Sequence, residues 1–247
     1  MVRFYLMIKS IVLTVLAGLF MLVSMAGGSL LAVMVAVFAK DKRRIFGNIS
    51  RVWARSILFI AGVKLIVKGT ENLNVAGPVV LIANHQGNFD IPVMMAALPF
   101  NFRFLVKEEL FRIPLFGWYM KKRGDVSINR KSPRDAIIAL KKISAIVKSG
   151  EPVMIFPEGT RSMDGKVGDF KRGSLIVAVN ADARIIPIAV SGSYNIQKRG
   201  TLLVNPTTVT VNIGSPVSIK EEEENAGRES ALLESIRQKV ISLMVDF

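Results

Sequence analysis

The longest stretch without a charged residue in this chain lies close to its amino end. Residues 10–39, between Lys9 and Lys40, carry no charge, and apolar side chains make up most of them. A helix of about 20 apolar residues is long enough to cross the hydrocarbon core of a bilayer. The stretch therefore predicts a membrane-attached protein, in which a globular part follows a membrane segment.

Three interpretations of residues 10–39 compete. A cleaved signal peptide would fit the basic start and the small residues at 24–26, but it does not need an apolar run that continues to residue 39. The other two are a helix that spans the bilayer and a segment that dips into one leaflet. Gly27 and Gly28 can bend a helix, and they favour a helical pair in one leaflet.

The segment after the apolar run bears on which side of the membrane the globular part faces. The sequence KDKRR at 40–44 is basic, and apolar side chains recur at helical spacing over 45–60, with Arg51 and Arg55 on the opposite face. This pattern predicts an amphipathic helix that either lies in the membrane interface or packs on the globular part. Basic residues beside a membrane segment favour the cytoplasmic side. We therefore expect the globular part to face the cytoplasm at the cell membrane.

From residue 63 onward, short apolar runs alternate with amphipathic segments. The apolar runs predict β-strands at 63–68, 79–83, 102–106, 126–128, 153–156, 185–191 and 208–213. The amphipathic segments predict helices at 90–98, 109–121, 133–149, 173–181 and 228–245. Strands that alternate with helices in this way form α/β domains. We expect a membrane anchor over 1–62 and, over 63–247, one α/β domain with a largely parallel mixed sheet flanked by helices.

Two of these helices have recognisable starts. Ser132 can cap the helix at 133–149, Asp135 can complete a capping box, and Gly150 can end the helix. The acidic run KEEEE at 220–224 is expected to lead into the last helix and to stay in solvent.

Charge and cysteine content narrow the classes of function. The formal net charge of +14 favours anionic partners, such as lipid headgroups, nucleic acid or an acidic carrier. The chain has no cysteine and one histidine, which excludes disulfides and thiolate chemistry and argues against a metal site. The few aromatic residues are not interleaved with the basic ones as a nucleic-acid surface would need. We therefore expect a membrane surface, and no nucleic acid, as partner.

The only histidine lies in the sequence NHQGNFD at 84–90, directly after a buried strand. His85 is followed five positions later by Asp90, which begins a predicted helix. A carboxylate on one ring nitrogen would fix the tautomer and leave the other nitrogen free as a general base. A structural histidine at a strand end is equally compatible with this spacing, so the pattern alone leaves both roles open.

A second polar motif, FPEGTRS at 156–162, also follows an apolar strand. Pro157 and Gly159 predict a tight turn whose backbone N–H groups can cradle an anion. Arg161 adds a planar fork that suits phosphate, and Glu158 could pair with Arg161 or another basic group and hold it in position. A plain surface turn with a salt bridge remains the alternative.

Taken together, these motifs resemble two signature blocks of the glycerolipid acyltransferases. Other blocks of that family have counterparts here in the same order and at similar spacing, and the resemblance covers roughly residues 64–215. These counterparts are KEELFRIPLFGW at 107–118, RGDVSINR at 123–130, FKRG at 170–173 and IIPIAVSG at 185–192.

The resemblance implies transfer of an acyl group from a thioester to a hydroxyl of a glycerophosphate lipid, without a cofactor or a metal. By position in the motifs, His85 is the general base and Asp90 orients it. The same comparison implies that the lipid phosphate is bound by a set of basic and turn residues. These are Lys107, Arg130, Glu158, Gly159, Thr160 and Arg161.

Within this family, the short chain and the forms of its motifs favour the members that acylate the sn-2 hydroxyl of 1-acylglycerol-3-phosphate (lysophosphatidate) to give phosphatidate. The acyl donor is expected to be acyl-coenzyme A or an acidic acyl carrier protein. Two alternatives remain. One is a sister acyltransferase that acts on glycerol-3-phosphate or another lysophospholipid, and the other, from a different class, is a non-catalytic basic module that binds anionic membranes or nucleic acid.

Overall fold

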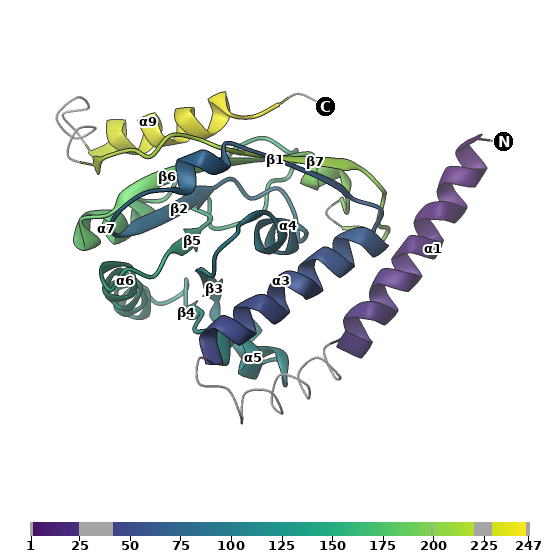
Figure 1. Ribbon diagram of the computed structural model, residues 1–247, viewed down its shortest axis with the longest axis horizontal. Coiled ribbons are helices and arrows are strands. Elements are labelled where there is room, and N and C mark those ends of the chain that lie inside the picture. The colour runs from purple at the N-terminus through teal and green to yellow at the C-terminus, as the bar shows by residue number, and fades with distance from the viewer. Residues whose placement is uncertain (1, 25–41, 199, 220–228, 246–247) are drawn as a thin grey trace.

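A seven-stranded sheet forms the centre of the computed structural model, which describes residues 2–24, 42–198, 200–219 and 229–245 (Figure 1). Three sequence features lie outside the described residues, and the expectations attached to them stay predictions. They are Gly27 and Gly28 in the apolar run, Lys40 and Asp41 of the basic cluster, and the acidic run at 220–224.

All seven predicted strands are present within a residue or two of their expected limits. They are β1 (Lys64–Lys68), β2 (Val79–Ala83), β3 (Arg103–Lys107), β4 (Val126–Ile128), β5 (Val153–Ile155), β6 (Arg184–Ser191) and β7 (Thr208–Ile213). Their order in the sheet is β1-β7-β6-β2-β5-β3-β4. Every neighbouring pair is parallel except β6 and β7, which are antiparallel. The prediction of an α/β domain with a largely parallel mixed sheet is confirmed.

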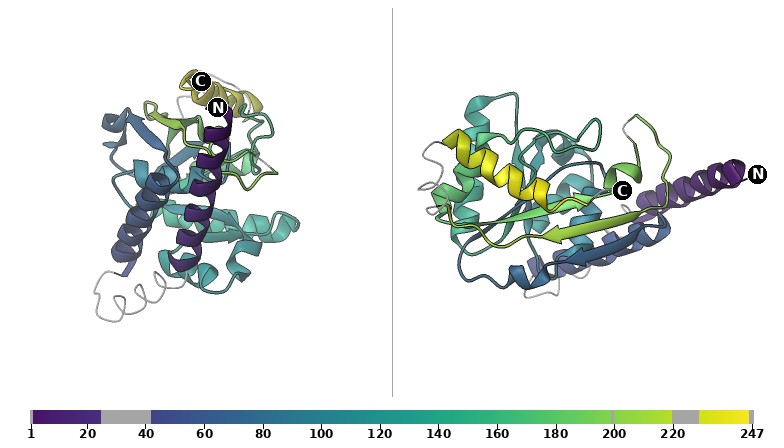
Figure 2. Two further views of the ribbon diagram at one scale, coloured as in Figure 1. Left: turned by 90° about the vertical axis from the view of Figure 1, so that its right-hand side faces the viewer. Right: turned by 90° about the horizontal axis from the view of Figure 1, so that it is seen from above.

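Helices cover both faces of this sheet (Figures 1 and 2). On one face lie α3 (Lys42–Ile60) and α4 (Asp90–Ala97), which share a core cluster with Leu81, Phe104 and Met154. The other face is covered by α6 (Pro133–Lys148), α7 (Arg172–Ala181) and α9 (Glu229–Ser242). The strands between these layers are buried on both faces, which explains why they read as continuous apolar runs in the sequence.

The limits of α6 follow the predicted capping signals. The Ser132 side chain accepts a hydrogen bond of 3.3 Å from the backbone N–H of Asp135, and Gly150 after the helix takes a positive φ of 89°. The carboxylate of Asp135 accepts from the Asn129 amide at 3.3 Å.

The predicted helix at 109–121 is wrong in its extent. The structure has a short 3₁₀ helix at Glu108–Arg112, followed by a separate helix, α5, at Phe116–Arg123. Pro114 lies between them. A proline lacks a backbone N–H and disfavours helical geometry at the residue before it, and Ile113 is accordingly extended. Two further 3₁₀ helices lie at Thr70–Leu73 and Ser193–Asn195.

The predicted amphipathic helix over 45–60 is α3, and it packs on the α/β domain. Phe46, Ile57 and Leu58 on its inner side are buried in the core, whereas Val52 and Phe59 are exposed. The predicted boundary at residues 62 and 63 falls at the end of the turn between α3 and β1. The division itself stays a prediction, since α3 shares its core with the sheet.

The first helix, α1 (Val2–Val23), lies beside α3 and projects beyond the sheet (Figure 2). It presents only a narrow stripe to the protein, where Ser10 and Ala17 are buried. The Ser10 hydroxyl donates a hydrogen bond to Oδ1 of Asn205 at 2.8 Å. The Thr14 hydroxyl accepts one from the Val204 N–H, also at 2.8 Å. Within the ranges that the structure describes, no helix is both long enough and apolar enough to cross a bilayer.

Candidate active site

The site residues expected from the sequence lie along one edge of the sheet. The strands β2, β5, β3 and β4 are adjacent and parallel, so their carboxyl ends meet at this edge. Open α/β sheets bind their ligands at such an edge. His85 follows β2, the FPEGTRS motif follows β5, Lys107 ends β3, and Arg130 lies just beyond β4.

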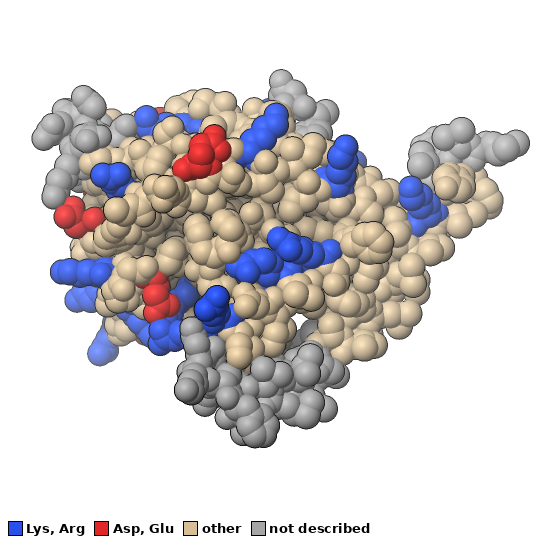
Figure 3. Space-filling view, in the orientation of Figure 1, with Lys and Arg blue, Asp and Glu red and all other residues tan. Residues whose placement is uncertain are grey.

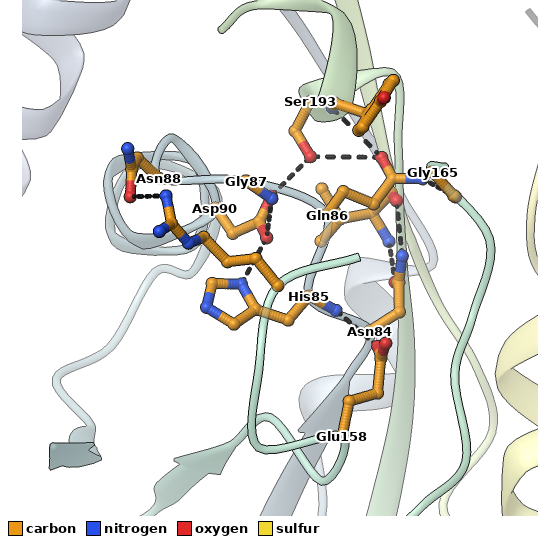
Figure 4. A network of polar contacts seen from close by, with 12 residues as sticks. Asn84, His85, Gln86, Gly87, Asn88, Asp90, Glu158, Gly165 and Ser193 are labelled. Carbon is orange, nitrogen blue, oxygen red and sulfur yellow. Dashed lines mark hydrogen bonds and ion pairs between the residues drawn. The ribbon is translucent and has the colours of Figure 1, made fainter. Parts of the chain in front are cut away.

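The imidazole of His85 is paired with the carboxylate of Asp90, as the sequence predicted (Figure 4). Nδ1 of His85 lies 2.6 Å from Oδ2 of Asp90, which is the first residue of α4 and is completely buried. A carboxylate only accepts hydrogen bonds, so Nδ1 carries the proton in the neutral ring. In the described part of the chain nothing hydrogen-bonds to Nε2, and this nitrogen is therefore free to accept a proton from a substrate.

Asp90 is held in place by two further donors. The Gly87 N–H donates to Oδ2 at 2.9 Å, and the Ser193 hydroxyl bonds to Oδ1. Ser193 also lies 3.2 Å from Oε1 of Gln86, whose amide nitrogen donates to the Gly165 carbonyl at 2.7 Å. The carboxylate thus has a fixed orientation before any substrate binds.

The backbone of His85 is clamped by the second motif. Its N–H donates to Oε1 of Glu158 at 2.7 Å, and its carbonyl accepts from the Ser162 N–H, also at 2.7 Å. The other Glu158 oxygen accepts from the Gly168 N–H at 3.0 Å. The two motifs therefore form one structural unit.

The predicted pairing of Glu158 with Arg161 is wrong. Both carboxylate oxygens of Glu158 are used by backbone amides, and the side chain is buried, so it has no free surface for a guanidinium or a phosphate. Burial raises the pKa of Glu158, although the hydrogen bonds from His85 and Gly168 oppose this shift. Its contribution to the site is to hold the His85 loop.

The predicted tight turn is present at residues 156–159. The Gly159 N–H donates to the Phe156 carbonyl at 3.1 Å, and Gly159 has a φ of 69°, which suits glycine. Thr160 follows and is exposed. Arg161 donates from Nη1 to Oδ1 of Asn88 at 2.6 Å, which brings its guanidinium to the His85 loop.

Lys107 and Arg130 are on the same edge but farther along it, on the side of β3 and β4. Nζ of Lys107 lies 3.2 Å from Oε1 of Glu109. The pKa of Glu109 is lowered, first by a hydrogen bond from its own backbone and then by the hydrogen bond with Lys107. Arg130 is exposed and close enough to Glu109 to interact with its charge. In the described chain no hydrogen bond joins either residue to the His85 loop.

Several residues that the sequence did not single out complete the site. Asn84 bridges to β6, because its side-chain amide both donates to and accepts from the Val190 backbone at 2.9 and 2.7 Å. The side chain of Lys171 lies over the turn, since a Cβ added to Gly159 would come within 3.0 Å of its Nζ. Asn84 belongs to the NHQGNFD motif, whereas nothing in the sequence points to Ser193 as a partner of Asp90.

The fold and the site define an α/β protein in which a His85–Asp90 pair, with Nε2 unbonded among the described residues, lies next to a turn that presents Arg161. Among the described residues, no three His, Asp or Glu side chains gather where they could hold a metal ion. The model of the family described as Acyltransferase matches residues 64–191, more than half of the chain, and the chain belongs to this family. The resemblance inferred from the motifs is confirmed.

Individual relatives agree with this assignment. The chain is 35% identical over 185 residues to the chloroplastic 1-acyl-sn-glycerol-3-phosphate acyltransferase LPAT1 of Arabidopsis thaliana, covering 74% of this chain and 51% of the relative. It is 31% identical over 176 residues to the 1-acyl-sn-glycerol-3-phosphate acyltransferase of Pseudomonas aeruginosa, covering 71% and 66%. The chain thus spans between 51% and 58% of the length of the plant and algal relatives it matches.

A solved structure extends the similarity to nearly the whole chain. The crystal structure of the 1-acyl-sn-glycerophosphate (LPA) acyltransferase PlsC from Thermotoga maritima superposes with a TM-score of 0.80 at 25% sequence identity. The match covers 95% of both chains. The two proteins therefore share their fold over nearly their full lengths.

Proposed function

We propose that this protein is a 1-acylglycerol-3-phosphate acyltransferase, which moves a fatty acyl group from a thioester to the sn-2 hydroxyl of lysophosphatidate and gives phosphatidate. The observation that carries the proposal is the His85–Asp90 pair, with Nε2 free, next to the turn that presents Arg161. The activities for which the relatives are named support it.

In the proposed reaction, Nε2 of His85 accepts the proton of the acceptor hydroxyl while the hydroxyl oxygen attacks the thioester carbonyl carbon. The C–S bond then breaks, and the leaving thiolate takes the proton from the imidazolium. Asp90 stabilises the positive ring between these steps, because its carboxylate lies 2.6 Å from Nδ1. The acyl group passes directly to the acceptor, so no nucleophilic side chain is needed.

The acceptor phosphate is proposed to bind at the turn after β5. Arg161 offers a planar donor fork, the turn offers backbone N–H groups near Gly159, and Lys171 adds a charge on the same side. Lys107 and Arg130 extend the positive edge outward. The proximity of Arg161 to Asn88, in the loop that carries His85, would place the acceptor hydroxyl within reach of the base.

For the donor, we propose that α6 offers a docking surface to an acidic acyl carrier protein. One face of α6 is exposed and combines two isoleucines with four basic residues, and in Figure 3 Lys and Arg gather where α6 lies in Figure 1. The members of this face are Arg134, Ile137, Ile138, Lys141, Lys142 and Lys148. An acidic protein surface complements such a face. Coenzyme A remains the other possible carrier of the thioester.

We propose that the protein attaches to the cytoplasmic side of the cell membrane. The basic residues after the apolar run favour this side, and the exposed side of α1 supports the attachment itself. Apart from its packed stripe and the exposed Lys9, the helix exposes mainly apolar side chains, and such a surface would be costly in water. Its large exposed side chains include Phe4, Ile8, Val12, Val15, Leu16, Leu19 and Leu22. Because α6 covers the opposite face of the sheet from α3, a protein bound to a membrane through α1 and α3 would keep α6 accessible.

The deciding experiment supplies the purified protein with labelled lysophosphatidate in vesicles and an acyl thioester. Formation of labelled phosphatidate is the expected result. Acylation of glycerol-3-phosphate or another lysophospholipid in its place would assign the sister activity. If no acceptor is consumed although the protein binds the vesicles, the chain is a binding module rather than an enzyme.

A further inference from the structure

We propose that Arg123 and Asp125 position the imidazole of His85 through two stacked rings, those of Phe104 and Phe156. The role as a base rests on the proposed function, whereas the arrangement of the rings is a property of the fold. Arg123 is a positioning residue in this proposal, because it acts on His85 only through the aromatic rings.

Three rings follow one another on one face of the sheet. The imidazole of His85 stacks on Phe156, with ring centroids 4.3 Å apart and an angle of 19° between the planes. Phe156 in turn faces Phe104 at 6.1 Å and 14°. Phe104 of β3 is paired with Met154 of β5, so Phe104 and Phe156 project from the same face.

Arg123 closes this series at the end of α5. Its guanidinium carbon lies 5.0 Å from the centroid of Phe104 and 5.7 Å from that of Phe102. A buried guanidinium over an aromatic face is attracted by the ring, and Arg123 is only 7% exposed. The last ring is therefore held from behind by a cation as well as by apolar packing.

Asp125 fixes both the cation and the strand that carries Phe104. Nε of Arg123 donates to Oδ2 at 2.8 Å, Nη2 donates to Oδ1 at 2.5 Å, and the Phe104 N–H also donates to Oδ1, at 2.8 Å. A buried ion pair is often no better for stability than apolar residues of similar volume. Its geometry here, with two groups tied to one carboxylate, suits a role in orientation.

The consequence for His85 is that its ring is constrained in two directions. Asp90 fixes one edge of the ring through Nδ1, and Phe156 fixes the plane of the ring. Together they determine where Nε2 points. A base has to lie within hydrogen-bond reach of its proton, and a displacement of about 1 Å can cost roughly 10²-fold in rate.

The presence of a single histidine makes this inference directly measurable. In protein labelled at histidine, the ring protons of His85 give the only imidazole signals in the NMR spectrum. A ring stacked on Phe156 shifts these signals upfield, and their position reports the stacking independently of activity. The variants are Phe104→Leu and the paired change Arg123→Met with Asp125→Leu, which removes both charges together.

The matched control is Phe46→Leu, which removes a buried aromatic ring that packs against Trp118 and Tyr119 rather than on the stack. We expect both stack variants to move the His85 signals and to lower kcat about ten-fold or more at an unchanged KM for lysophosphatidate. The control should lose stability to a similar degree with the signals and kcat unchanged. Arg123→Lys with Asp125 in place should keep part of the kcat that the paired change loses, since lysine keeps the positive charge.

Two results would overturn the positioning role. One is a folded stack variant whose His85 signals and kcat both match the parent protein, and the other is a fall in kcat without any change in the signals. If the paired change prevents folding, Phe104→Leu alone decides between these results. If the parent protein proves inactive on lysophosphatidate, the proposed function fails, while the NMR signals still decide whether Arg123 and Phe104 control the ring.

Discussion

The carboxylate of Glu158 accepts a hydrogen bond of 2.7 Å from the backbone N–H of His85. This contact joins the NHQGNFD and FPEGTRS motifs. The sequence had suggested that the same carboxylate pairs with Arg161 or another basic group. Its second oxygen accepts from Gly168 at 3.0 Å, and the Ser162 N–H donates to the His85 carbonyl at 2.7 Å, so hydrogen bonds tie the loop that carries the imidazole to the turn that presents Arg161. This contact would keep the proposed base and the proposed phosphate site at a fixed separation.

Replacing Glu158 by Gln should destabilise the protein and lower kcat. The Gln nitrogen cannot accept a hydrogen bond, so one of the two buried amides would lose its acceptor, at about 1–3 kcal/mol. Because the folded-state pKa of Glu158 is raised by burial, its contribution to stability is largest below the unfolded pKa of about 4.3 and falls as pH rises through the folded pKa. Unfolding measured between pH 4 and pH 7 should show this loss in the parent and not in Glu158→Gln.

Glu229 provides the control for this pH dependence. It is exposed and paired with Arg172, and that pairing lowers its pKa, so the stability it contributes is lost as pH falls, in the opposite direction. In Glu229→Gln, the stability of the protein should therefore still fall as pH rises, as it does in the parent. Identical pH profiles for Glu158→Gln and the parent would show that the Glu158 proton is not linked to folding.

Removing the imidazole should abolish turnover without unfolding the protein. General-base assistance contributes about 10²–10⁴-fold to rate, so His85→Ala should lower kcat by this factor with a nearly unchanged KM. Asp90→Asn should also lower kcat strongly, because an amide cannot stabilise the imidazolium as a carboxylate does. Kinetics on lysophosphatidate at saturating donor measure both, and near-normal turnover by His85→Ala would exclude it as the base.

Arg161→Ala should chiefly raise the KM for lysophosphatidate, because a phosphate contact present in both ground and transition states supplies binding. Arg161→Lys should recover only part of the affinity, since an ammonium lacks the planar fork. Arg184 is exposed at the amino end of β6, away from the site, and Arg184→Ala is the matched control. A loss of kcat at constant KM in Arg161→Ala would remove it from the binding role.

The sequence was most informative where burial is complete. Strands such as β2 and β5 are covered on both faces, so their apolar runs had no competing interpretation. The pairing of His85 with Asp90 was also accessible, because a strand, a short loop and a helix start bring positions five apart together. The predicted helix at 109–121 is interrupted at Pro114, because apolar spacing continues through this residue although proline has no backbone N–H.

Contacts between distant segments were out of reach of pattern analysis. Glu158 could be expected to pair with a neighbouring cation, but its partners are backbone N–H groups, which every residue except proline carries. Ser193 meets Asp90 only because β6 lies next to β2 in the sheet, an order that the sequence does not specify. Side-chain identity predicts which groups can interact, while topology decides which of them meet.

The basic face of α6 gives a prediction about the acyl donor. Changing Lys141 and Lys142 together to Glu should raise the KM for acyl carrier protein several-fold and leave the KM for acyl-coenzyme A unchanged, because only the protein donor contacts this surface. The effect should shrink at high salt, as screening weakens exposed charges. Equal effects on both donors, or none on either, would show that α6 is not a docking site for a carrier.

The apolar surface of α1 gives a prediction about the membrane. Leu16 and Leu19 are 48% and 54% exposed and lie outside the packed stripe of Ser10 and Ala17. Changing both to Glu should leave the fold intact but release the protein from anionic vesicles in a flotation assay, because charged side chains cannot enter the apolar layer without a large cost. Activity on long-chain lysophosphatidate in vesicles should fall with binding.

The matched control is Val179→Glu, because Val179 is also exposed, at 45%, but lies on α7 and covers the opposite face of the sheet. This variant should float with vesicles like the parent.

Direct changes on α1 are a sharper test than removing residues 1–60, since α3 supplies Phe46 and Ile57 to the core and its loss would open the domain. If Leu16→Glu and Leu19→Glu together leave both binding and activity unchanged, α1 is not the membrane contact. If the double change does release the protein, a cysteine introduced at residue 2 separates the two anchoring geometries. One-leaflet insertion keeps this cysteine inaccessible to an impermeant reagent outside intact cells, whereas a spanning segment exposes it.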